Sequence, residues 1–126
     1  LAGCGSARDY ITLAALPSST VLAPSNLGAP ILAYTPHRAL AGPYHRNTAG
    51  NLATLDMLMA DPDEAERLIR AAGVTLVAFC PGNNETKFLA DAAPGGLLAA
   101  LASGRTPAWL KPLSPADAAL IVYRMQ

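Results

Sequence analysis

Residues 61–80 read "DPDEAERLIRAAGVTLVAFC", and this stretch decides the fold class. Asp61 is a typical helix N-cap, Pro62 suits the first helical position, and Gly73 suits the residue just past a helix end. The next seven residues, 74–80, form a mainly apolar run that is typical of a strand covered on both faces. A helix that leads through a glycine into a buried strand is the second half of a parallel crossover, which predicts an α/β fold.

The flanking sequence adds further helices and strands. Apolar spacing and turn residues predict helices at 7–16, 26–36, 48–60 and 94–104, and strands at 20–25 and 38–43. "AWLKPL" (108–113) and "AALIVYRM" (118–125) predict a hairpin, joined by "SPAD", in which Pro115 suits the second position of a type I turn. "PGNNETKF" (81–88) is predicted to be a loop. The expected fold is a layered, Rossmann-like α/β domain with a mixed, largely parallel sheet of about five strands, flanking helices and a C-terminal hairpin.

Charged residues are scarce in this chain. They make up 14% of the sequence, roughly half the ~25% that is usual in soluble domains, whereas 52% of the residues are hydrophobic. The net charge is zero and neither sign is clustered, which argues against nucleic acid as a partner. Residues 10–36 carry no charge, but Pro17, Pro24 and Pro30 interrupt any helix long enough to span a membrane. So low a charge content indicates a domain that works beside another component.

The sequence lacks the familiar catalytic and cofactor motifs. It contains no Gly-x-Ser-x-Gly, no phosphate-binding loop and no His-Glu-x-x-His, and "LAGCGS" (1–6) lacks the strand and third glycine of a dinucleotide loop. The two histidines, His37 and His45, would need carboxylate partners to bind a metal, and the sequence has no Asp or Glu between Asp9 and Asp56. We therefore expect no cofactor and no metal site.

Two polar clusters are candidates for ligand or interface contact. The first, in "AGPYHRNTAGN" (41–51), consists of Tyr44, His45, Arg46 and Asn47, at the point where a predicted strand gives way to a helix; His37 precedes that strand. Ligands gather at the carboxyl ends of strands in open α/β sheets, and a helix N-terminus with an arginine suits phosphate. The alternative is structural, with Asn47 as a helix cap and His45 bonded to a carbonyl.

The second cluster follows the buried strand and contains Asn83, Asn84, Glu85 and Lys87, of which Asn83 and Asn84 are the candidates for contact. By the same argument it is expected near the first cluster.

Two interpretations are open for the cysteines, because Cys4 and Cys80 could form one disulfide, or Cys80 could be a buried free thiol. "LAGC" (1–4) additionally matches the pattern at which bacterial lipoproteins are cleaved and lipidated on cysteine.

Several phrases resemble a known family when they are taken in order. "TVLAPSNLGAPILAYTPHRALAGPYHRN" (20–47), "GVTLVAFCPG" (73–82), "AWLKPL" and "AALIVYRM" together resemble the extracytoplasmic C-terminal domain of bacterial multi-pass membrane proteins of the GT-C glycosyltransferase type. The resemblance covers about residues 8–125. It implies a transmembrane bundle of the same chain before Leu1, a linker at 1–6 and one soluble domain at 7–126. It further implies a place on the periplasmic face of the bacterial inner membrane.

The resemblance credits no catalysis to this domain, since the catalytic acid of GT-C enzymes generally lies between membrane helices. The first hypothesis is therefore a non-catalytic domain that packs on the membrane bundle and could help to seat a polyisoprenyl-phosphate-sugar donor or its acceptor. The chain begins with Leu1 rather than Met, which fits a piece of a longer protein. Two alternatives stay open: a free-standing α/β hydrolase or nucleotide-binding domain that uses Tyr44–Asn47, and an interaction module lipidated on Cys4.

Overall fold

The computed structural model describes residues 3–42 and 47–126. Its centre is a five-stranded sheet in the order β2-β1-β3-β5-β4. The strands are β1 Thr20–Leu22, β2 Arg38–Ala39, β3 Leu76–Phe79, β4 Leu110–Pro112 and β5 Ile121–Met125. β1 pairs in parallel with β2 and β3, whereas β5 pairs antiparallel with both β3 and β4. The predicted mixed sheet with a C-terminal hairpin is confirmed.

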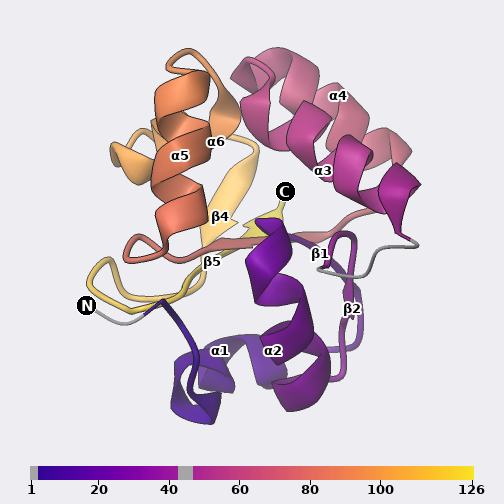
Figure 1. Cartoon of the computed structure of the whole chain (residues 1–126), viewed down its shortest axis with the longest axis vertical. Coiled ribbons are helices and arrows are strands. Elements are labelled where there is room, and N and C mark those ends of the chain that lie inside the picture. The colour runs from indigo at the N-terminus through magenta and orange to yellow at the C-terminus, as the bar shows by residue number, and fades with distance from the viewer. Residues whose placement is uncertain (1–2, 43–46) are drawn as a thin grey trace.

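Helices cover both faces of the sheet. One layer consists of the 3-10 helix η1 Ala7–Tyr10, α1 Ile11–Ala14, the 3-10 helix η2 Ser25–Leu27 and α2 Gly28–Tyr34. The other layer consists of α3 Thr48–Met59, α4 Pro62–Ala71, α5 Asn84–Ala92 and α6 Leu97–Ala102. Figure 1 shows α1 and α2 on one side of the sheet and α3 to α6 on the other. Within the described residues, no helix has the length and apolar character needed to cross a membrane.

Each helical layer has its own hydrophobic core. Val77 and Phe79 of β3 pack with the α3 to α6 layer, and Leu76 and Ala78 pack with the α1/α2 layer. This division follows from the pleat, because successive strand residues point to opposite faces of a sheet. All four residues of β3 are buried, which confirms a strand covered on both faces.

The local signals around α4 act as predicted. Asp61 Oδ1 accepts hydrogen bonds from Asp63 N (3.1 Å) and Glu64 N (3.3 Å), and Pro62 is the first helical residue. Gly73 follows the helix with φ +71°, a left-handed conformation in which a side chain would be strained. The bonds from Gly73 N to Arg70 O and from Val74 N to Ile69 O complete a Schellman motif and turn the chain directly into β3.

Three local predictions are wrong. Residues 81–88 are not a loop throughout, because Asn83 caps α5, which begins at Asn84. The strand expected at 38–43 is only Arg38–Ala39, since beyond Leu40 the backbone bonds to side chains of α3 instead of extending the ladder. In the hairpin connection Ala118 N bonds to Pro115 O, which places Pro115 at the first turn position rather than the second.

Candidate functional site

The carboxyl ends of β1 and β3 form the usual ligand position of this type of sheet. β1 and β3 are neighbours, and the chain leaves β1 towards η2 and α2 on one face but leaves β3 towards α5 on the other (Figure 1). In open α/β sheets, ligands bind where successive connections diverge in this way. The polar residues at this switch point are Ser25 and Asn26 of η2, with Asn83 and Glu85 at the start of α5.

These four side chains satisfy one another. Glu85 Oε2 accepts from Ser25 Oγ (2.8 Å) and its Oε1 accepts from Asn26 N (2.9 Å). Asn83 Oδ1 accepts from Asn26 Nδ2 (2.9 Å) and from Glu85 N (2.8 Å), which caps α5. The carboxylate of Glu85 thus bonds the donors at the start of η2 and joins η2 to α5.

The two asparagines of this cluster differ in environment. Asn83 is 7% exposed and its Oδ1 accepts two hydrogen bonds of the network, whereas Asn84 is exposed. Glu85 belongs to the same predicted cluster, but no local pattern specifies its bonds, because its partners Ser25 and Asn26 lie 60 and 59 positions away. The switch point is therefore a closed internal contact between the two helical layers, and Asn84 is its outward neighbour.

His37 is a structural residue in this fold. Its ring is 3% exposed, Nδ1 accepts from Ser19 N (3.1 Å), and Nε2 donates to Leu13 O (2.6 Å). This pattern requires the neutral tautomer with its proton on Nε2. Both ring nitrogens bond backbone groups, so His37 connects the end of α1 to the segment that enters β1. Neither ring nitrogen is left to bind a ligand.

Asn47 does not cap α3 with its side chain, contrary to the expectation. It occupies the N-cap position, but its Nδ2 donates to Leu40 O (3.1 Å). Asn51 Oδ1 accepts from Gly42 N (3.1 Å), so two side chains of the first helical turns hold the backbone that leaves β2. A Cβ at Gly50 would collide with Leu40 O, which explains a glycine inside this helix. Tyr44, His45 and Arg46 lie outside the described residues, and their contact role stays a prediction.

Cys4 and Cys80 form a disulfide with an S–S distance of 2.11 Å and a Cα–Cα distance of 6.2 Å. Both residues are fully buried, and Tyr10 Oη donates to Cys4 O (2.5 Å). The bond holds residue 4 of the expected linker against the carboxyl end of β3. A lipid on the Cys4 thiol and this disulfide are mutually exclusive, so the lipidated-module alternative is overturned. Across the described residues, no three His, Cys, Asp or Glu side chains gather as a metal site.

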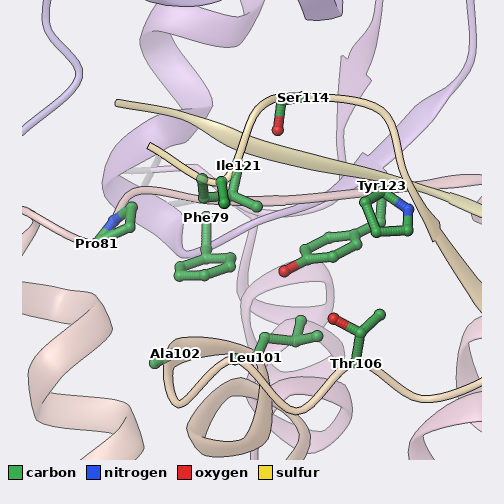
Figure 2. A pocket seen from close by; sticks show the side chains of 11 residues that line it. Phe79, Pro81, Leu101, Ala102, Thr106, Ser114, Ile121 and Tyr123 are labelled. Carbon is green, nitrogen blue, oxygen red and sulfur yellow. The ribbon is translucent and has the colours of Figure 1, made fainter. Parts of the chain in front are cut away.

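A pocket of about 280 Å³ lies between α6, the segment that follows it and the C-terminal hairpin (Figure 2). Its core is a pair of aromatic rings, Phe79 of β3 and Tyr123 of β5, whose centroids lie 6.3 Å apart at an interplanar angle of 7°. Leu101 and Ile121 add apolar wall, and none of the lining residues is charged.

Hydroxyl groups supply the polarity of this pocket. Tyr123 and Thr106 both line this pocket, and Figure 2 shows Thr106 below the ring of Tyr123. Burial raises the pKa of Tyr123 above its usual value, and the nearby Thr106 hydroxyl opposes that rise. Ser114, on the opposite side, accepts from Val122 N (2.9 Å). The sequence contains no motif that links these residues, since three separate segments bring them together.

Comparisons with known proteins bear on the fold. No protein-family model and no curated protein matches the chain. Among solved structures, the chain is similar to the C-terminal globular domain of an oligosaccharyltransferase from Archaeoglobus fulgidus, with a TM-score of 0.67 and 12% sequence identity. The match covers 94% of this chain and 92% of the other. Over nearly its whole length, therefore, the chain has a fold like that of an oligosaccharyltransferase C-terminal globular domain.

Proposed function

We propose that this chain is a non-catalytic, extracytoplasmic domain of a GT-C-like glycosyltransferase membrane protein, and that it packs on the membrane part of its parent. The observation that carries the proposal is the likeness to a domain of an oligosaccharyltransferase, which spans 94% of this chain. The ordered phrases that resemble GT-C C-terminal domains support the same assignment from the sequence.

The α1/α2 layer offers a surface for such packing. From Tyr10 to His37 the sequence holds no Asp, Glu, Lys or Arg, whereas the opposite layer carries many. On this layer Ile11 is 68% exposed and Leu32 is 49% exposed. An uncharged surface with exposed large apolar side chains is typical of a site covered by another component. We assign the membrane bundle of the same parent chain as that component.

The disulfide supports the extracytoplasmic location. Disulfides form and persist in oxidising compartments and are rare in the cytosol. The buried Cys4–Cys80 bond thus favours a position outside the cytoplasm, and the periplasmic face of a bacterial inner membrane is the specific location that we propose.

The geometry favours a non-catalytic role over the hydrolase or nucleotide-binding alternative. The described part of the chain holds His37 with both ring nitrogens engaged, and Ser25 Oγ and Asn26 N at the switch point both bond Glu85. Within the proposal, the segment that contains Tyr44, His45 and Arg46 keeps the role of contacting a phosphate-linked lipid sugar. Beside this segment, the backbone that follows β2 is held by two side chains at the start of α3: Asn47 Nδ2 donates to Leu40 O, and Asn51 Oδ1 accepts from Gly42 N.

Hydrogen exchange tests the packing. We would compare the amide exchange of this domain alone with that of the full parent protein in lipid nanodiscs. The expected result is extra protection in the parent at α1 and α2. The matched reference is the surface of α3 around Leu52, a leucine that is 57% exposed on the opposite layer. Extra protection confined to α3, or none in either layer, would refute the packing.

A further inference from the structure

The pocket in Figure 2 has the features of a built binding site. Its volume of about 280 Å³ lies just below the ~300 Å³ at which pockets for drug-sized ligands begin, so it suits a ligand of one ring. The pocket lies where α6 ends at Ala102 and Gly104, with φ +80°, turns the chain, so that the end of α6 and the segment after it face β5 and the hairpin connection. The opening is therefore a product of the fold.

The lining excludes charged ligands. Its eleven residues include no Asp, Glu, Lys, Arg or His. A phosphate or carboxylate that entered would lose hydration without gaining a counter-charge, which is costly. The ligand that fits this site is uncharged.

The hydroxyls require a ligand that both donates and accepts hydrogen bonds. The hydroxyls of Tyr123 and Thr106 each bring a proton and lone pairs to the lining, so both can donate to and accept from a partner. Ser114 accepts from Val122 N, which leaves its own proton to donate. A ligand without hydroxyls would cover these groups and leave them without hydrogen-bond partners, which weakens binding.

The rest of the wall is apolar and complements the carbon face of a ring. Phe79, Leu101 and Ile121 are buried side chains, and Pro81 and Pro112 stand at the margin of the pocket. A ligand of one ring with an apolar face and several neutral hydroxyls matches the volume of the pocket, its lack of charge, its hydroxyl groups and its apolar wall. We propose that this pocket binds a single uncharged pyranose unit, with Tyr123 and Thr106 as the hydroxyl contacts. The inference rests on the pocket alone and does not require the domain to belong to a membrane protein.

The test is NMR titration of the isotopically labelled chain. The probes are the methyl pyranosides of glucose, galactose and mannose, with cyclohexanol as a ring of the same size that has one hydroxyl. We expect at least one pyranoside to shift the amides of Ala102, Ser114 and Ile121 in a saturable manner, and cyclohexanol to shift them far less. If none of the pyranosides shifts these amides at tens of millimolar, or if cyclohexanol shifts them as strongly, the inference is wrong.

Two variants remove the proposed contacts while keeping shape. Tyr123→Phe and Thr106→Val should each weaken pyranoside binding about tenfold, the equivalent of one hydrogen bond. The matched controls are Tyr34→Phe and Thr12→Val, which remove hydroxyls from the α1/α2 layer and should leave the affinity unchanged. Equal affinity in all four variants would overturn the assignment. Binding of methyl maltoside in the same pocket would identify the ligand as the end unit of a glycan. Exclusion of methyl maltoside would identify the ligand as a free monosaccharide. Both results uphold the pyranose site.

Discussion

At the scale of single residues, His37 shows how a predicted site residue becomes a structural one. Substitution His37→Ala leaves Ser19 N without a partner, leaves Leu13 O with only its bond from Leu16 N (3.3 Å), and removes the packing of a buried ring. An unpaired buried group costs about 1–3 kcal/mol, and the lost packing adds to that cost. We expect the free energy of unfolding, measured by urea titration, to fall by about 3 kcal/mol. His37→Asn can keep an acceptor near Nδ1 and His37→Gln a donor near Nε2, so both should lie between wild type and His37→Ala. Wild-type stability in His37→Ala would contradict this role.

Tyr10 gives the molecule a specific response to alkaline pH. Burial, followed by the charges of Asp9 and Tyr34, raises the pKa of Tyr10 to about 12. The unfolded chain releases this proton near pH 10, so in the window from about 10 to about 12 the folded state holds more protons than the unfolded state. Stability is therefore complete below pH 10 and decreases as the pH rises through this window.

The pH effect can be isolated by mutation. Urea titrations at several alkaline pH values should show a steeper loss of stability in wild type than in Tyr10→Phe. A residual slope should remain in the variant, because burial also raises the pKa of Tyr123. Identical slopes in the two proteins would show that Tyr10 does not couple to folding.

Single-residue roles were predictable from the sequence only when their partners are close in the chain. Asp61 bonds amides two and three residues ahead, and its capping role followed from residue type and position alone. Glu85 and His37 depend on partners 18 to 60 positions away, which no local pattern specifies. Asn47 illustrates the same limit, since its bond to Leu40 O prevails over the helix cap that its position suggests.

At the scale of elements, the start of α5 holds the two helical layers together. Substitution Asn83→Ala removes the cap on Glu85 N and the acceptor for Asn26 Nδ2, and loss of a cap alone costs about 1 kcal/mol. We expect a total loss of about 2 kcal/mol in the free energy of unfolding. Asn84→Ala is the matched control, because Asn84 is exposed and its substitution should stay within about 0.5 kcal/mol. Equal losses in the two variants would contradict the network.

The elements differ in how well the sequence predicted them. α4 and β3 carry cap, stop and burial signals that agree with one another, so both were expected where they occur. α5 was missed because Pro81, Gly82, Asn83 and Asn84 are all common in turns, and the same residues also suit a helix start. β2 is short because the contacts of Gly42 with α3, rather than its own propensity, end it.

At the scale of the whole molecule, the disulfide closes 76 positions of chain. A cross-link of this span lowers the entropy of the unfolded state and contributes about 4 kcal/mol. Reduction with dithiothreitol should therefore lower the free energy of unfolding by about that amount. In the double variant Cys4→Ala/Cys80→Ala the reductant should have no effect, which serves as the control. Unchanged stability of the wild type after complete reduction would contradict the contribution of this bond.

The fold class followed from alternating helices and strands, but the pocket did not, because its hydroxyls come from positions 106, 114 and 123 on three segments without a shared motif. The proposed position beside a membrane bundle rests on the resemblance and on the uncharged stretch from Tyr10 to His37. The most direct test follows the full parent protein in its own cells by carbonate extraction, and in spheroplasts, whose outer membrane has been opened, by protease added from outside. We predict that this domain stays with the membranes and is cut by the protease in intact spheroplasts. Recovery of the domain in the soluble fraction, or its protection until the spheroplasts are lysed, would contradict an extracytoplasmic domain of a membrane protein.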